Sequence, residues 1–284
     1  MSLLGFMLVL AAAVCHATWN FFVKRINAGP ELVWLFSVIT VAIYSPLAVY
    51  FALTMETIDR VGISFIVGSC IIHLGYFLLL QKGYRTGDLS VVYPTARATG
   101  PMLSTIFAIV LLGEQATMQG GLGALVIIFG VLMLAGGLKV RSAEQITSLL
   151  FGVGAGTLIG SYTVWDAYAV SVLALPPLLL DYSSSFGRML LLAPVAARRK
   201  GSVAEIWRKH KPGLFVIAIF NPLAYILALV AMTFTPVTYI APIREVSVVL
   251  TVLLGSLVLG EGNLKSRLTW SCVILAGVSI LASA

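Results

Sequence analysis

Two arginines lie inside long apolar segments, where a charged side chain needs a partner. Arg97 lies in the segment "VVYPTARATGPMLSTIFAIVLLGE", and Arg244 lies 147 residues further on in "TYIAPIREVSVVLTVLLGSLVLGE". An unpaired guanidinium at bilayer depth is energetically costly. A guanidinium also presents planar, bidentate donors that suit a carboxylate, a phosphonate or a phosphate. The sequence therefore predicts that Arg97 and Arg244 bind an anionic substrate group.

Protein groups are the alternative partners of both arginines. Arg244 has Glu245 beside it and Asp166 in another segment, and Arg97 has a helix-end carbonyl. Adjacent residues diverge by about 100° around a helix, so Glu245 is also placed to pair with a different helix. Both interpretations stay open at the level of the sequence.

Other polar and aromatic residues form narrow stripes at helical spacing. Arg97, Gly100 and Ser104 follow one another at i, i+3 and i+7, and His73 and Tyr76 are three residues apart. A narrow polar stripe on an apolar helix must face the bundle interior or a water-filled cavity. Besides the arginines, the predicted substrate-binding residues are Tyr93, His16, Trp19, Asn20, His73, Tyr76, Trp165, Asn221 and Tyr225. For the tryptophans, core packing is the alternative.

Four titratable residues in these segments are candidates for carrying a proton. Histidine titrates near neutral pH, and burial can bring a carboxyl group into the same range. We therefore predict that proton coupling involves Asp166, His16, His73 or Glu245. Each histidine has an alternative role as a packing residue that donates a hydrogen bond to a neighbouring helix.

A further set of residues marks helix ends, bends and a polar patch. Each of two "LGE" motifs closes on a glutamate, which can hydrogen-bond to a helix end or form a gate. Proline near a helix start loosens the backbone at little hydrogen-bond cost, whereas proline inside a helix bends it. Structural or gating roles are predicted for Glu114, Glu261, Pro94, Pro242, Pro101, Asp181 and Arg188; the last two, seven residues apart, predict a structural network with nearby serines.

The composition indicates which elements position these residues. Hydrophobic residues make up 60% of the sequence, charged residues only 10%, and the mean hydropathy is +1.02. Apolar runs of about 20 residues can each cross a bilayer as a helix. Ten such spans are predicted, at 3–23, 31–53, 62–82, 88–112, 119–138, 147–170, 176–197, 212–233, 236–259 and 266–283. The predicted fold class is an all-α membrane protein with ten transmembrane helices.

The distribution of basic residues predicts an orientation. Of the 18 Lys and Arg residues, 14 fall in the loops on one side of the predicted bundle and only Arg60 on the other. The positive-inside rule places the first side in the cytoplasm and both termini outside it. The net charge of +7 is thereby explained without a nucleic-acid partner. The basic segment "RRKGSVAEIWRKHK" is most simply an orientation signal, and binding of lipid headgroups is its alternative role.

The sequence contains the same pattern twice. With the offset of 147 residues, "LGE" at Glu114 aligns with "LGE" at Glu261, and "VIIFGVLMLA" aligns with "VILAGVSILA". Near the start of each half, "HATWN" aligns with "YTVWD". Two five-helix units are predicted, at 1–143 and 144–284, and an odd number of spans inverts the second unit in the membrane. Such inverted repeats surround a central cavity that can open to either side.

Signatures of enzymes and cofactors are missing from the sequence. It contains no Gly-rich phosphate loop and no cluster with metal-ligand spacing. Cys15, Cys70 and Cys272 have no redox spacing and are predicted to be small apolar fillers. We therefore predict no catalytic role, no cofactor and no metal.

At the level of motifs, the chain resembles the EamA-type branch of the drug/metabolite transporter superfamily. "LLGEQATMQGGLGALVIIFGVLML" and "VLGEGNLKSRLTWSCVILAGVSILA" are similar to the paired helix-end signatures of that family. "GYFLLLQKGYRTGDLSVVYP" and "AYILALVAMTFTPVTYIAP" are similar to the helix pairs that precede them. The resemblance implies that helices 1, 3, 4, 6, 8 and 9 line the central cavity. Many relatives have cytoplasmic termini, so termini outside the cytoplasm are a departure.

The internal repeat, the polar stripes and the family resemblance together predict a secondary transporter of the bacterial inner membrane. Export of an amino acid or related carboxylate is the leading expectation, and phosphonates or other organic anions are the next. A translocator of lipids or lipid-linked headgroups is an alternative, because it would use the same inverted repeat. A structural or sensory membrane subunit is a third class. The predicted partners are a small-molecule substrate and membrane lipid, and the chain is expected to be a monomer or homodimer.

Overall fold

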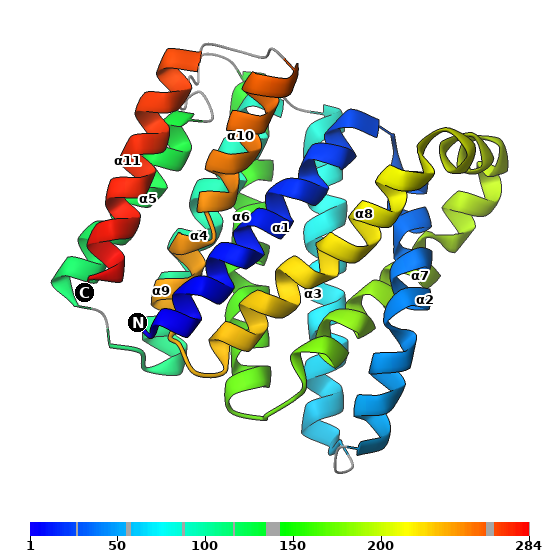
Figure 1. Ribbon diagram of the computed structural model, residues 1–284, viewed down its shortest axis with the longest axis horizontal. Helices are drawn as coiled ribbons and strands as arrows, with labels where there is room; N and C mark the ends of the chain where they lie inside the picture. Colours follow the sequence, from blue (N-terminus) through cyan, green and yellow to red (C-terminus); the bar gives the residue numbers. More distant parts are fainter. Residues whose placement is uncertain are drawn as a thin grey trace.

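The computed structural model describes residues 1–26, 28–54, 58–86, 89–115, 117–134, 143–259 and 264–283. Within these ranges all regular secondary structure is helical (Figure 1). The helices are α1 (Leu3–Ile26), α2 (Pro30–Thr54), α3 (Arg60–Thr86), α4 (Leu89–Leu112), α5 (Met118–Leu134), α6 (Ala143–Ser171), α7 (Pro177–Arg198), α8 (Lys200–Met232), α9 (Val237–Ile243), α10 (Val246–Leu259) and α11 (Leu264–Ala282).

Length and composition make six of these helices able to cross a membrane. They are α1, α2, α3, α4, α6 and α8, and shorter apolar helices lie within α5 and α11. An apolar bundle in lipid must satisfy its backbone hydrogen bonds internally, which helices do. Helix α7 is less apolar because it carries Asp181, Arg188 and a run of serines. The prediction of an all-helical, membrane-spanning chain is confirmed.

Two of the predicted spans differ from the helices in the structure. The span at 236–259 consists of two helices, because regular α-helix ends at Ile243 and starts again at Val246. The span at 212–233 is the second part of a longer helix, α8, which has a kink at His210 (φ −129°, ψ 24°). Pro212 follows the kink; it donates no backbone hydrogen bond and its ring crowds the preceding turn.

Close helix pairs build the bundle. Helix α4 packs on α6, α1 on α8, α3 on α6, α2 on α7, and α5 on α11. Glycine allows the closest of these approaches: a Cβ at Gly123 of α5 would lie 2.7 Å from the backbone nitrogen of Leu281 in α11. Small residues at such crossings let two helix backbones touch, and van der Waals packing then holds them in lipid.

Apolar clusters hold this arrangement around its centre. The largest is formed by buried residues of α1, α6, α9, α10 and α11, among them Val9, Ile240 and Ile274. A second cluster joins α2 to α8 through Leu32, Leu214 and other residues. Most of the polar residues predicted from the sequence lie on α1, α3, α4, α6 and α8 or between α9 and α10, whereas Asp181 and Arg188 lie on α7.

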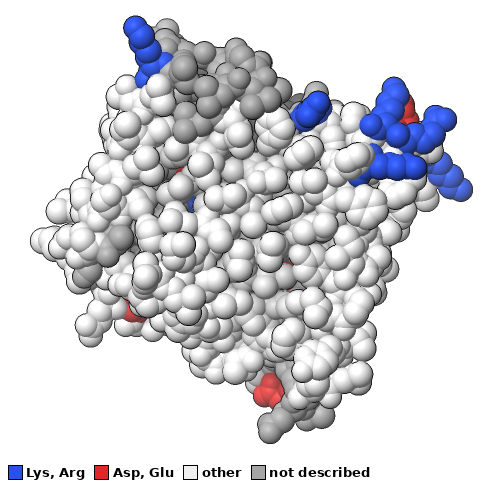
Figure 2. Space-filling model, in the orientation of Figure 1, with Lys and Arg blue, Asp and Glu red and all other residues white. Residues whose placement is uncertain are grey.

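Most basic residues at the surface of the bundle gather at one end. Figure 2 shows Lys and Arg atoms along the upper edge, most densely over the corner where α7 meets α8. Both chain termini lie near the opposite edge in the same orientation (Figure 1). One end of the bundle is therefore basic and the other end carries the termini.

Candidate functional site

A buried ion pair joins α4 to the start of α10. Nη2 of Arg97 lies 2.8 Å from Oε2 of Glu245, and the two side chains are 15% and 5% exposed. The same Nη2 donates to Oγ of Ser247 at 3.3 Å. Arg97 therefore pairs with a carboxylate outside its own helix, and Glu245 pairs across the bundle with Arg97.

This ion pair lies at a break between two helices. The amide of Glu245 donates to the carbonyl of Pro242, and the amide of Ser247 donates to that of Arg244, both at 3.0 Å. Both hydrogen bonds connect residues three positions apart, as in a 3₁₀ turn, so the groups at the helix ends are satisfied by tighter turns than those of an α-helix. Irregular backbone within an apolar bundle is tolerated where it is buried in protein or lines a cavity.

A second polar cluster lies between α3, α6 and α8. Oδ2 of Asp166 lies 2.9 Å from Nε2 of His73 and accepts a hydrogen bond from the Tyr225 hydroxyl at 2.6 Å. The Asp166 side chain is fully buried, and its other oxygen, Oδ1, has no hydrogen-bond partner. Asp166 therefore pairs with His73 and Tyr225 and does not pair with Arg244.

Aromatic rings connect the two clusters. The guanidinium of Arg244 lies over the ring of Tyr225, 5.4 Å from its centroid. Tyr162 stacks on His73 at 4.0 Å, and the ring of Tyr76 lies edge-on at 5.8 Å from Tyr162. Sequence reasoning left Tyr162 out of the site, although the alignment of "HATWN" with "YTVWD" places it opposite His16 in the repeat.

Helix α1 contributes a third group near the arginines. His16 lies close enough to Arg97 and Arg244 for their charges to interact with it. Nδ1 of His16 accepts a hydrogen bond from the Trp19 indole at 3.3 Å, and its backbone carbonyl accepts one from the Asn20 amide at 2.8 Å. Trp19 and Asn20 therefore position His16 within its own helix.

Several predicted residues lie outside this central group or outside the described residues. The Trp165 indole donates to the Phe65 carbonyl at 2.9 Å and stacks on the Phe65 ring, so it packs α6 on α3. Asn221 is half-buried on α8, one turn before Tyr225. The side chains of Tyr93 and Pro94, and all of Glu261, lie outside the described residues.

Asp181 and Arg188 lie apart from the central group, on α7. Nη2 of Arg188 donates to Oγ of Ser185 at 2.9 Å, and the guanidinium lies 5.9 Å from the Phe36 ring centroid. Oδ2 of Asp181, a buried residue, has no hydrogen-bond partner. The two side chains form no ion pair with each other in the described part of the chain, so the network predicted for them consists of separate contacts.

Glu114 connects the end of α4 to the start of α9. Its carboxylate oxygens accept hydrogen bonds from the backbone amides of Val237 at 2.7 Å and Thr238 at 2.9 Å. These amides belong to the first turn of α9, which has no side-chain cap of its own. Gly113, with φ +69°, provides the left-handed turn that ends α4 and directs Glu114 there.

The predicted prolines lie on both sides of the central group. Pro101 lies inside α4, where its carbonyl accepts a hydrogen bond from the Ser104 hydroxyl at 3.0 Å. Pro242 is buried near the end of α9, two residues before Arg244. Only the second therefore stands beside a break in regular helix.

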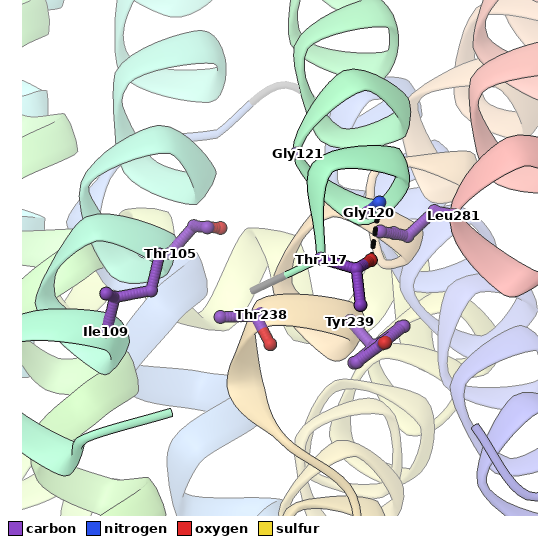
Figure 3. A pocket seen from close by; sticks show the side chains of 8 residues that line it. All are labelled: Thr105, Ile109, Thr117, Gly120, Gly121, Thr238, Tyr239 and Leu281. Carbon is purple, nitrogen blue, oxygen red and sulfur yellow. Dashed lines mark hydrogen bonds between the residues drawn. The ribbon is translucent and has the colours of Figure 1, made fainter. Parts of the chain in front are cut away.

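A small hollow lies beside the start of α9, away from the charged centre. Figure 3 shows it between Thr105, Thr238, Tyr239 and Leu281, with the Thr117 hydroxyl accepting from the Gly120 amide at 2.9 Å. Its volume is about 50 Å³, which holds a few water molecules and no metabolite. The charged groups of the centre, and not this hollow, are the candidate site.

The central group combines two positive and two negative side chains. Arg97 is paired with Glu245, and Asp166 is hydrogen-bonded to His73 and Tyr225. Among the residues that the structure describes, Arg244 takes part in no ion pair and contacts an aromatic face. The described residues also include no group of three potential metal ligands. The arrangement therefore brings Arg97, Glu245 and Arg244 close to the hydrogen-bonded pair of His73 and Asp166.

Comparison with known proteins agrees with this fold. A crystal structure of a protein superposes on the chain with a TM-score of 0.75, covers 98% of both chains and is 14% identical in sequence. The model of the EamA-like transporter family matches residues 3–136 and again residues 146–283. Together with the apolar helices, these matches make the chain a multi-pass membrane protein and a transporter of the drug/metabolite transporter superfamily. The chain belongs to the EamA-like transporter family.

Proposed function

We propose that the chain is a secondary transporter that moves an amino acid or related carboxylate by alternating access. Its ten spans form two inverted five-helix repeats, 1–143 and 144–284, around the central charged group. The protein lies in a bacterial inner membrane with the basic end of the bundle in the cytoplasm. Transport runs outward, from the cytoplasm.

The pattern of helix packing supports the inverted repeats. In the two proposed repeats, α1 is equivalent to α6, α2 to α7, α3 to α8, α4 to α9–α10, and α5 to α11. Each helix can therefore be exchanged for its equivalent and the contacts compared. The contact between α1 and α8 then becomes the contact between α6 and α3, and that between α4 and α6 becomes that between α10 and α1. The pairs α2–α7 and α5–α11 are unchanged. The same family model matches the chain twice, once in each half.

One observation carries the proposal: buried charges from both repeats meet at a broken helix. Arg97 comes from the first repeat, and Glu245 and Arg244 come from the break in the second. Burying charges is costly unless they are paired or used in function. Discontinuous helices at the repeat interface are typical substrate sites of secondary transporters.

The chemistry of the group favours a substrate with a carboxylate. The Arg244 guanidinium is the cation without an acidic partner among the described residues, and a carboxylate is its natural bidentate ligand. The unpartnered Oδ1 of Asp166 can accept from an ammonium group, which an amino acid also supplies. The rings of Tyr162 and Tyr225 provide an apolar wall for the rest of the substrate.

We also propose that these residues couple transport to protons. A proton taken up by the His73–Asp166 pair cancels the charge that an anionic substrate would otherwise face. His16, near both arginines, is the second candidate for this role.

Ligand-dependent melting tests the proposal. The detergent-purified protein is melted with amino acids, dicarboxylates, phosphonates, organic cations and lipid headgroups at pH 6 and pH 8. A ligand at 100 times its Kd stabilises the folded state by about 2.7 kcal/mol. We expect an amino acid or carboxylate to raise the midpoint of the wild type and not that of Arg244→Gln.

The control is Arg25→Gln, which removes an exposed arginine at the end of α1 and is expected to respond as the wild type does. The best ligand is then tested for counterflow in proteoliposomes, where wild type exchanges it and Arg244→Gln does not. A cationic ligand, or a carboxylate that binds Arg244→Gln equally well, would overturn the substrate assignment.

A further inference from the structure

The first part of α8 differs in direction from the helices that cross the bundle. Residues 200–209 precede the kink at His210, and Figure 1 shows this part turned away from the axes of its neighbours. Ile206 is buried, whereas Glu205, Arg208 and Lys209 are exposed. A short helix with one apolar and one charged face is typical of a segment lying at the membrane surface.

An apolar groove runs between this segment and the helices beside it. It is open on one side, has a volume of about 520 Å³, and is lined by Trp34 of α2, Ala193 and Ala197 of α7, and Ala204 and Trp207 of α8. Lys200 is the charged residue in its wall. The volume of the groove is within the usual range for ligand-binding pockets, and its walls are almost entirely apolar.

Further basic side chains lie near this groove. Nζ of Lys211 lies 5.5 Å from the centroid of the Trp207 ring. Between residues 198 and 211 the chain carries six Lys or Arg residues and one acidic residue, Glu205, which pairs with Lys209 at 2.7 Å. Figure 2 shows this density of basic atoms at the same corner.

The α7–α8 corner is held in place by its own polar contacts. Nη1 of Arg199 lies 3.2 Å from the buried carboxylate of Glu31 in α2, and the Ser202 hydroxyl donates to the same carboxylate at 3.0 Å. One basic residue is therefore used to fix the corner. Lys200 and Lys211 keep their positions at the groove and stay exposed.

We propose that this groove binds an anionic phospholipid, with an acyl chain against the apolar walls and the phosphate against Lys200 and Lys211. Tight binding in the groove requires both parts of that ligand. A zwitterionic lipid has the acyl chain but no net charge, and free phosphate has the charge but no acyl chain. Each basic residue near an anionic lipid surface contributes about 1 kcal/mol of attraction. This inference depends only on the chain lying in a membrane, and not on the proposed substrate.

Native mass spectrometry of the detergent-released protein tests the proposal. The full chain is titrated with equal amounts of phosphatidylglycerol and phosphatidylcholine, and the fraction carrying each lipid is measured. Wild type is expected to retain phosphatidylglycerol preferentially. Lys200→Gln with Lys211→Gln should weaken its apparent affinity by about ten- to thirty-fold, whereas Lys200→Arg with Lys211→Arg keeps it.

Matched variants separate the groove from general charge and from general surface. Lys82→Gln with Lys265→Gln removes two other exposed lysines and should leave the preference unchanged. Ala204→Phe fills the groove and should lower binding, whereas Ala52→Phe adds the same ring at an exposed position on α2 and should not. Equal retention of both lipids by wild type, an equal loss in both lysine pairs, or unchanged binding by Ala204→Phe would each overturn the proposal. Transport plays no part in this readout.

Discussion

The contact between Glu114 and α9 predicts a large effect of one substitution at the surface of the bundle. Both carboxylate oxygens of Glu114 accept hydrogen bonds from the first-turn amides of α9. Replacing an N-cap side chain by alanine costs about 0.5–2 kcal/mol. Charge-assisted hydrogen bonds are about twice as strong as neutral ones, and a negative charge at a helix N-terminus adds about 0.3–1 kcal/mol. Glu114→Ala should therefore lose about 2 kcal/mol of stability.

The melting temperature of the detergent-purified protein measures this loss. For a chain of this size, about 2 kcal/mol corresponds to a decrease of roughly 4–8 °C. Glu114→Gln keeps one acceptor oxygen but loses the charge, so it should melt between wild type and Glu114→Ala. The control is Glu205→Ala, which removes an exposed glutamate paired within its own helix. Such an exposed pair contributes little to stability, so its shift should be about 1 °C.

The ordering of the three variants decides between a capping role and a simple charge effect. If Glu114→Ala melts within 1 °C of Glu205→Ala, the carboxylate does not hold the start of α9 and the reasoning fails. If Glu114→Gln melts as low as Glu114→Ala, the charge matters and the two hydrogen bonds do not.

Further substitutions test the packing and the central polar contacts. Gly123→Ala should lower stability by about 1–3 kcal/mol, because the added methyl group would clash with the α11 backbone. Gly201→Ala is the control, since its methyl group would enter open space, and melting temperatures measure both variants. Arg97→Gln should destabilise by about 3–5 kcal/mol by leaving a buried carboxylate unpaired, and adding Glu245→Gln should restore much of that stability. Tyr225→Phe removes the 2.6 Å donor to a buried carboxylate and should cost about 1–3 kcal/mol in the same melting assay.

Sequence periodicity predicted the helices well because apolar segments in lipid have few alternatives. A run of about 20 apolar residues must form a helix to satisfy its backbone, whatever it packs against. The polar stripes also indicated which helices carry functional groups, and His73, Asp166 and Tyr225 do meet. This success has a physical reason: an isolated polar group in an apolar segment must find another such group.

Partner choice was not predictable from the sequence. Arg97 pairs with Glu245 because α4 passes the break between α9 and α10, and neither that crossing nor the break is encoded by local spacing. The pattern at 236–259 is continuously apolar around the charges, so it predicts one helix. Tyr162 could have been found, because the internal repeat aligns it with His16. The cap by Glu114 required the position of α9, which only the folded chain supplies.

Three polar contacts join the two halves of the chain and bear on conformational change. Arg97 to Glu245, His73 to Asp166 and Glu114 to the start of α9 each join a residue before position 143 to one after it. Helix α9 is held at its first turn by Glu114, while the break beyond its last turn is held through Glu245. Any motion of α9 relative to α4 must therefore break one contact or pivot about the other.

A substrate that competes for the central contact would change which end of α9 is free to move. In the proposed mechanism, a carboxylate bound at Arg244 would repel the carboxylate of the adjacent residue Glu245 and would thereby weaken the Arg97–Glu245 pair. The Glu114 cap lies at the other end of α9 and is not weakened by that charge. Substrate binding would thus loosen α9 at the break while its first turn stays fixed. An alternating-access mechanism needs such an unequal release, since two ends freed together would open the bundle on both sides.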